Sequence, residues 1–153
     1  MSLEIDRTPP LDEMKELLRE YPASIPVALE AADYEEWLAT LPGPYAPPLG
    51  ALLVARADGA AAGCVCLRPL GDGSGEVKRM YVREAFRGRG IGRALVEECI
   101  ALGRAAGFAQ LRLDTHSTMT PARTLYESYG FVEIPAYWDH PIPGVVFYEL
   151  DLT

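Results

Sequence analysis

Apolar residues recur along this chain with two different periods, and the period changes from segment to segment. Spacings of three and four residues predict a helix from Pro10 to Glu20, with an apolar side on Leu11, Met14, Leu17 and Leu18. The same spacing predicts a second helix over about 27–40, with an apolar side on Ala31, Tyr34, Trp37 and Leu38. The segment "LPGPYAPP" follows, and its prolines cannot continue a helix. We expect it to form a loop that lines a substrate entrance.

From residue 51 onward the pattern favours strands separated by two helices. The runs "ALLVARA" and "AAGCVCLRPL" flank Asp58-Gly59, a favoured hairpin turn, and "EVKRMYV" predicts a strand over 76–82. A helix is predicted from Ile91 to about Ala106, and another with Thr120 as its N-cap, each ending before a glycine. Further strands are expected over 3–7, 109–115, 131–134 and 144–152. This order predicts one mixed α/β domain over residues 1–153.

Charge and composition narrow the classes of partner. A net charge of −8 argues against nucleic acid, because phosphate binding rewards a basic surface. No apolar run approaches the ~20 residues that span a membrane, and "MSLEIDRTPP" lacks the pattern of a secretion signal. We therefore expect a cytoplasmic protein with no membrane partner. Three cysteines without C-x-x-C spacing and only two histidines predict no disulfide and no metal site. Cys64 and Cys66 are expected to face one side of a strand as small buried residues.

The most informative stretch is "EAFRGRGIGRALVEE", residues 84–98, where glycines and arginines precede a helical pattern. Glycines allow close backbone approach to a ligand, and the first amides of a helix are unpaired donors that attract phosphate. The loop lacks the Lys-Ser or Lys-Thr of a P-loop. It also misses the G-x-G-x-x-G dinucleotide fingerprint, because Gly92 comes one residue early and Arg93 holds the required place.

A different motif fits. "RGRGIG" matches [RQ]-x-x-G-x-[GA], follows a strand and opens a helix, and a later helix carries "LYESYGF". In these features the chain resembles the GNAT superfamily of N-acetyltransferases, strongly over residues 76–131 and fairly over 51–152. The first 50 residues match only in being helical. The resemblance implies an α/β fold with a central, mostly antiparallel sheet, flanked by about four helices, whose strands 76–82 and 109–115 splay apart.

The resemblance also implies where acetyl-CoA, the expected co-substrate, would bind. The backbone of Met80 and Val82 would pair with its pantetheine arm, and a backbone amide near Met80–Tyr81 would face the thioester oxygen. The pyrophosphate would be held by the loop and first turn of the helix, on Arg87, Gly88, Arg89, Gly90, Ile91, Gly92 and Arg93.

Two catalytic residues are predicted with the help of the family pattern. Tyr126 is the candidate acid for the departing thiolate, with Tyr129 as the less favoured alternative on the same helix. Glu76, eleven residues before Arg87, is the candidate base for the amine, and it needs burial or a relaying water to act as one. His116 is an alternative base, and many family members use waters or backbone carbonyls instead.

Neighbouring residues receive less specific interpretations. Asp114 is expected to tether a loop, and Lys78 and Arg79 are interpreted as surface charges. The segment "IPAYWDHPIPG", residues 134–144, either walls the acceptor site or packs as a rigid loop on the core.

These predictions define an N-acetyltransferase that moves an acetyl group from acetyl-CoA to a primary amine by direct attack in a ternary complex. The acceptor is expected to be a small molecule, or a peptide or protein amine. A non-catalytic acyl-CoA sensor and a protein whose loop binds ATP or NAD are the alternatives. Exposed sheet edges leave a homodimer open.

Overall fold

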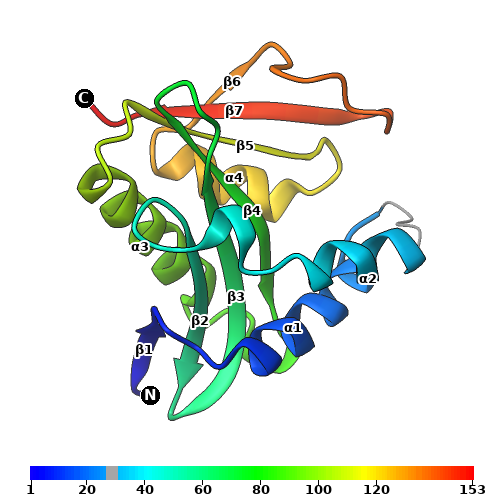
Figure 1. Cartoon of the computed structure of the whole chain (residues 1–153), viewed down its shortest axis with the longest axis vertical. Coiled ribbons are helices and arrows are strands. Elements are labelled where there is room, and N and C mark those ends of the chain that lie inside the picture. Colours follow the sequence, from blue (N-terminus) through cyan, green and yellow to red (C-terminus); the bar gives the residue numbers. More distant parts are fainter. Residues whose placement is uncertain (27–30) are drawn as a thin grey trace.

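The computed structural model describes residues 1–26 and 31–153, and its centre is a seven-stranded sheet in the order β1-β2-β3-β4-β5-β7-β6 (Figure 1). The strands are β1 (Leu3–Asp6), β2 (Ala51–Ala57), β3 (Ala60–Pro69), β4 (Ser74–Val82), β5 (Gln110–His116), β6 (Val132–Ile134) and β7 (Val145–Asp151). Strands β4 and β5 pair in parallel, and the other neighbours are antiparallel. The predicted mixed, mostly antiparallel sheet is therefore confirmed.

Four α-helices flank this sheet, with short 3₁₀ turns between elements. The helices are α1 (Leu11–Glu20), α2 (Ala31–Ala39), α3 (Ile91–Ala105) and α4 (Thr120–Ser128), and the turns are η1 (Tyr21–Ser24), η2 (Gly43–Tyr45) and η3 (Glu84–Phe86). Period-2 alternation divides the core between the two faces of the sheet. Leu53 belongs to the core with α3 and α4, whereas its neighbour Val54 belongs to the core with α1 and α2. Cys64 and Cys66 both lie in the α1–α2 core, as predicted.

The sheet opens between β4 and β5. These strands pair only where Ser74–Glu76 meets residues 110–112, and the rest of β4 runs away from β5. Figure 1 shows β2, β3 and β4 running down the molecule while β5 and β7 cross its top. The predicted splay is confirmed, and it leaves the C-terminal half of β4 without a neighbour on its β5 side.

A β-bulge at Arg79 lies in this unpaired half. Cys64 pairs with Tyr81 and Cys66 with Lys78, so Arg79 and Met80 oppose the single residue Val65. Arg79 has a φ of 58°, a left-handed conformation that costs a non-glycine residue roughly 1–2 kcal/mol. The bulge brings the side chains of Lys78 and Arg79 to the same side of the sheet, the side that carries α1 and α2.

Some sequence-based predictions need correction. Met119, not Thr120, is the N-cap of α4, and no side-chain hydrogen bond caps it. The second helix begins at Ala31 within the described residues. The first four residues of the predicted helix, 27–30, lie outside them. The proline-rich connector packs its buried Tyr45 beside Trp37 and lines a separate hollow next to β2, away from the site described below.

One ion-pair cluster joins the N-terminal elements to the sheet. Arg56 on β2 pairs with Asp6 on β1 and with Glu13 on α1.

Within residues 1–26 and 31–153, no helix has both the length and the apolar composition needed to cross a bilayer.

Candidate active site

The first turn of α3 offers an uncapped set of backbone donors. Gly90, the N-cap residue, has a φ of 80°, and the first intrahelical bond runs from the amide of Ala94 to its carbonyl at 3.1 Å. The amides of residues 91–93 therefore have no intrahelical acceptor. A Cβ placed on Gly88 or Gly90 would meet no heavy atom within 4 Å, so the space in front of these residues is open. This arrangement fits a phosphate group.

Three arginines surround this turn, all of them exposed. The Nε of Arg87 donates to the carbonyl of Val82 at 3.2 Å. Arg89 lies over the ring of Phe86 and Arg93 over the ring of Tyr129. Their positive charges reinforce the attraction of the helix N-terminus for an anion.

A groove of about 400 Å³ leads from this turn along the unpaired half of β4. We call it the β4–α4 groove, because β4 forms one wall and α4 the other. Its lining includes Met80, Val82, Arg87, Gly92, Ala122 and Leu125. Residues from both of the predicted coenzyme-binding segments, on β4 and on α3, thus line one groove.

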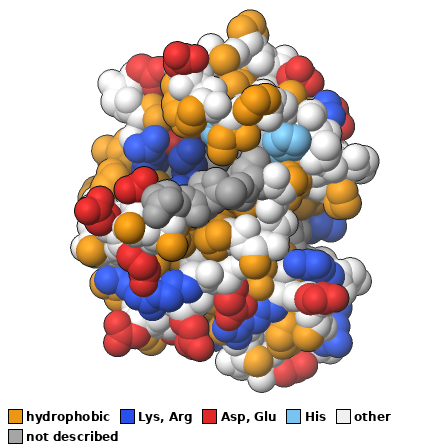
Figure 2. Space-filling view, turned by 90° about the vertical axis from the view of Figure 1, so that its right-hand side faces the viewer, with side chains coloured by type: hydrophobic (Ala, Val, Ile, Leu, Met, Phe, Trp, Pro, Cys, Tyr) orange, Lys and Arg blue, Asp and Glu red, His pale blue; other side chains and the backbone are white. Residues whose placement is uncertain are grey.

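A smaller cavity of about 110 Å³ continues from the groove toward η1 and the β6–β7 connection. We call it the Tyr126 cavity; it shares Met80, Met119 and Ala122 with the β4–α4 groove. Figure 2, which faces the right-hand side of Figure 1, shows histidine side chains (pale blue) among hydrophobic ones on this side of the molecule. A thioester carried along the groove would reach its acceptor where the two spaces meet.

Tyr126 lies at this junction. Its side chain is buried among Phe131 and Tyr148, and its hydroxyl is 4.0 Å from the sulfur of Met80. Burial raises the pKa of Tyr126, so the phenol keeps its proton at neutral pH. The alternative acid, Tyr129, donates instead to Glu97 on α3 and lines neither space.

Glu76 is buried, which is one of the two conditions for its action as a base, but both of its carboxylate oxygens already have partners. It is 1% exposed, and Oε1 accepts from the Nε of Arg68 at 2.8 Å and lies 3.8 Å from the Nζ of Lys78. Oε2 accepts from the hydroxyl of Tyr137 at 2.6 Å, and burial and this carboxylate raise the pKa of Tyr137. Glu76 lines a hollow beside the Tyr126 cavity, and not the cavity itself.

Both histidines line the Tyr126 cavity. In each ring, the nitrogen that could act as a base already accepts a hydrogen bond from a backbone amide. The Nε2 of His116 lies 3.1 Å from the carbonyl of Pro143, which requires a proton there, and Nδ1 accepts from the Thr118 amide at 3.3 Å. The Nδ1 of His140 accepts from the Ile142 amide at 3.1 Å, which places the ring proton of the neutral form on Nε2. Burial lowers the pKa of His140, which favours that neutral form.

Asp114 joins β5 to the 134–144 segment, as predicted. Its Oδ2 accepts from the indole Nε1 of Trp138 at 3.1 Å and from the Nζ of Lys78 at 3.5 Å. Within the described residues Oδ1 has no hydrogen-bond partner, and Asp114 lines the Tyr126 cavity. The segment is thus both tethered to the sheet and part of the cavity wall, since His140 and Ile142 also line it.

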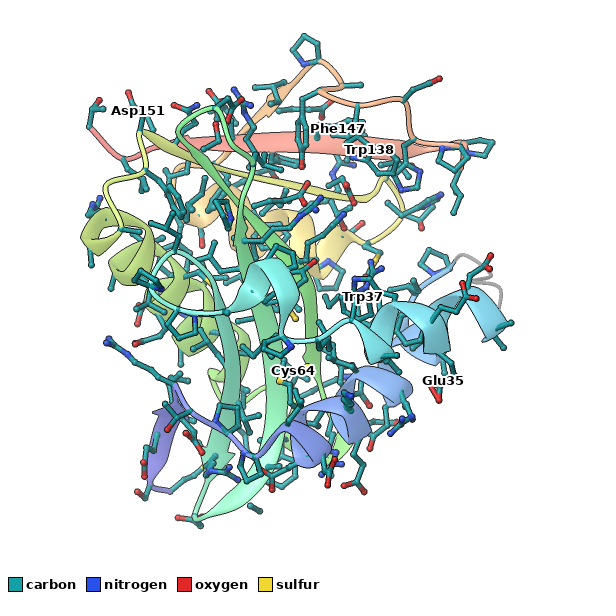
Figure 3. All side chains as sticks on the ribbon, in the orientation of Figure 1. Glu35, Trp37, Cys64, Trp138, Phe147 and Asp151 are labelled. Atoms are coloured by element: carbon teal, nitrogen blue, oxygen red, sulfur yellow. The ribbon has the colours of Figure 1, made fainter. Side chains whose placement is uncertain are left out.

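The interpretation of Lys78 and Arg79 as surface charges is wrong. Both are half-buried, and Arg79 lies 4.8 Å from the centre of the Trp37 ring. Figure 3 shows Trp37 on α2 and Trp138 in the 134–144 segment, on elements far apart in sequence. The sequence signal that marks Arg79 is weak, because only the bulge turns its side chain toward α2.

A sheet splayed at β4 and a helix that begins with unpaired backbone amides match the fold and the motif expected of an N-acetyltransferase. The chain belongs to the acetyltransferase (GNAT) family, whose model matches residues 11–131. It is 39% identical over 145 residues to an uncharacterised N-acetyltransferase from Schizosaccharomyces pombe. The matched region covers 94% of this chain and 89% of that protein. The family and this relative support an acetyltransferase enzyme.

Solved structures share its fold. A GNAT-family acetyltransferase from Staphylococcus aureus Mu50 superposes with a TM-score of 0.82 at 19% identity, covering 99% of this chain and 100% of that one. The PaiA N-acetyltransferase from Thermoplasma acidophilum, solved in complex with coenzyme A, superposes with a TM-score of 0.72 at 18% identity, covering 99% of both chains. These solved structures show that the chain has the fold of this family.

Proposed function

We propose that the protein transfers an acetyl group from acetyl-CoA to the primary amine of a small molecule or of a peptide or protein. The observation that carries the proposal is the junction of the β4–α4 groove with the Tyr126 cavity beside the hydroxyl of Tyr126. The groove supplies a path for the thioester, and the cavity supplies a separate approach for the amine. Two approaches to one point suit a ternary complex.

The coenzyme would be held mainly by backbone groups. The amides of residues 91–93 and the open space before Gly88 and Gly90 suit the pyrophosphate. The unpaired half of β4, around Met80 and Val82, offers peptide groups to the pantetheine arm. Arg87, Arg89 and Arg93 contribute charge around the same turn.

The chemical step forms a C–N bond and breaks the C–S bond of the thioester. The amine nitrogen attacks the carbonyl carbon, loses a proton, and the departing thiolate takes a proton. Tyr126 is proposed as the donor of that second proton, because its hydroxyl lies at the junction and a phenol can share its proton with a thiolate that forms beside it. The proton that the amine loses then restores the phenol. Its raised pKa keeps the proton available until the thiolate forms.

For the first proton, we propose a water in the Tyr126 cavity, with the carboxylate of Asp114 attracting the ammonium form of the acceptor. The role of Glu76 as the base stays a prediction. Its two oxygens are already engaged by Arg68 and Tyr137, so acting on the amine would require an intervening water and a rearranged Tyr137.

Direct attack is preferred to a covalent enzyme intermediate because the cysteines are poor nucleophiles. Burial raises the pKa of Cys64 to about 12 and also raises the pKa values of Cys66 and Cys99. Each thiol therefore stays protonated at neutral pH, and the thiolate is the nucleophilic form.

An amine-panel assay tests the proposal. The purified chain is incubated with acetyl-CoA and each amine, and CoA release is measured together with the mass of the acetylated product. Thermal shifts with acetyl-CoA, CoA, NAD and ATP accompany it, because a ligand at 100 times its Kd stabilises the fold by about 2.7 kcal/mol. We expect stabilisation by the two CoA species alone. Stabilisation by NAD or ATP without CoA would overturn the proposal.

A further inference from the structure

Arg79 places a cation with an unsatisfied donor in the wall of the Tyr126 cavity. Its guanidinium lies 4.8 Å from the Trp37 ring centre, 5.5 Å from that of Tyr21 and 5.6 Å from that of Tyr34. The cation therefore lies over three aromatic rings, which attract it electrostatically. The Nε atom is buried, and among residues 1–26 and 31–153 it has no hydrogen-bond partner.

The other cations near β4 are paired within the described residues, and Arg79 differs from them. Lys78 contacts Glu76 and Asp114, and Arg83 forms a two-armed pair with Glu20 on α1. No ion pair joins Arg79 to a carboxylate of residues 1–26 or 31–153. A buried donor without an acceptor is costly. Arg79 lines the cavity, where a carboxylate would accept from the guanidinium N–H groups that face it.

The polar groups of the Tyr126 cavity are arranged as a pair of opposite charges. Arg79 comes from the bulge of β4, and Asp114 comes from β5 on the other side of the splay. His140, in its neutral form, adds an Nε2–H donor to the lining. With a volume of about 110 Å³, the cavity is smaller than the roughly 150 Å³ cavity that binds benzene in an engineered protein core. It therefore suits a small, dipolar ligand.

We propose that the acceptor is a small amino carboxylate, such as an amino acid, whose carboxylate binds the guanidinium of Arg79 while its amino group faces Asp114 and the thioester. This inference rests on the proposed function and specifies the acceptor of the same site. The bulge is then the device for specificity, because without the extra residue Arg79 would not share a face with Lys78. The aromatic rings of η1 and α2 fix the guanidinium before the ligand arrives.

Matched acceptors test the inference. Common L-amino acids, their α-carboxamides and the corresponding amines that lack the carboxyl group are compared by kcat/KM at saturating acetyl-CoA. We expect at least one amino acid to exceed its carboxamide and its decarboxylated amine by about 10- to 100-fold, the value of a hydrogen bond to a charged group. L-Aspartate and L-glutamate are included, so that a side-chain carboxylate can replace the α-carboxylate.

Variants of Arg79 separate recognition from structure. Arg79→Gln is expected to abolish the preference for the carboxylate, Arg79→Lys to keep part of it, and both to leave the KM for acetyl-CoA within about threefold. Arg104→Gln is the matched control, since Arg104 is exposed in the last turn of α3. A purely structural Arg79 would instead lower the thermal stability and the rates on all acceptors alike, and that result would overturn the inference.

The outcomes also separate this inference from the proposed function. Acetylation of amines without any preference for carboxylates would overturn the inference and leave the acetyltransferase activity in place. CoA binding without acetylation of any amine in the panel would overturn both the proposed acceptor class and the inference. Thermal shifts of the CoA-loaded chain with each amino acid provide a readout that does not depend on turnover.

Discussion

Alanine at Gly90 tests whether the first turn of α3 holds the coenzyme's phosphates. Gly90 has a φ of 80° and a ψ of 13°, and no heavy atom lies within 4 Å of the position its Cβ would take. The added methyl group therefore clashes with nothing in the free protein. It strains the backbone by roughly 1–2 kcal/mol and occupies the space through which a phosphate would approach.

The methyl group would prevent the phosphate from reaching one or more backbone donors, and the expected rise in the Kd for CoA follows from the hydrogen bonds lost. A hydrogen bond to a charged group contributes about 1.5–3 kcal/mol, so losing one bond raises the Kd for CoA about 10- to 150-fold. A CoA concentration that stabilises the original chain by about 2.7 kcal/mol would stabilise a variant with a 100-fold weaker Kd by only about 0.4 kcal/mol. Titration calorimetry measures the same loss directly.

Gly107 offers a control on the same helix. It follows the C-terminal end of α3 with a φ of 81°, and its Cβ position is equally open. Gly107→Ala should therefore lower the stability by a similar amount while leaving the Kd for CoA unchanged. Equal CoA affinities in the Gly90→Ala and Gly107→Ala proteins would refute the assignment of a phosphate site to this turn.

Three further changes test the site and the fold. Tyr126→Phe should lower kcat by about 10²–10⁴-fold, the usual contribution of a proton-transfer group, whereas Tyr129→Phe should leave kcat unchanged. Burial raises the pKa of Tyr126, so we expect no loss of activity from its ionisation up to about pH 10. Asp114→Asn should raise the KM for the amine, whereas Glu76→Gln should chiefly lower the melting temperature; a large fall in kcat for Glu76→Gln at unchanged stability would establish that residue as the base. The two carboxylates paired with Arg56 have lowered pKa values because it donates to them, so they stabilise the fold above their unfolded pKa values, and this contribution disappears as the pH falls through the folded values. Arg56→Gln should therefore cost roughly 1 kcal/mol at neutral pH, and this cost should disappear as the pH falls below the lowered pKa values of the two carboxylates, measured by urea unfolding.

Short-range patterns predict the secondary-structure elements and the glycine-rich turn that begins α3. Hydrophobic periodicity depends on residues a few positions apart, so the strands and helices were placed to within a few residues. The turn before α3 is continuous in sequence, and its donors are backbone amides whose availability follows from the helix start alone. The motif around Tyr126 was likewise local, and α4 carries its hydroxyl to the junction of groove and cavity.

The surroundings of Arg79 and Glu76 depend on contacts between segments that are far apart in the sequence. Arg79 looked like an exposed charge until a one-residue bulge against β3 turned its side chain toward α2. Glu76 had the family spacing, yet Arg68 and Tyr137, from β3 and the 134–144 segment, enclose it. The family and the coenzyme could thus be inferred from the chain as written, because they depend on a contiguous backbone motif. The polarity of the acceptor cavity arises from the register of β4 and from side chains brought together across the splayed sheet.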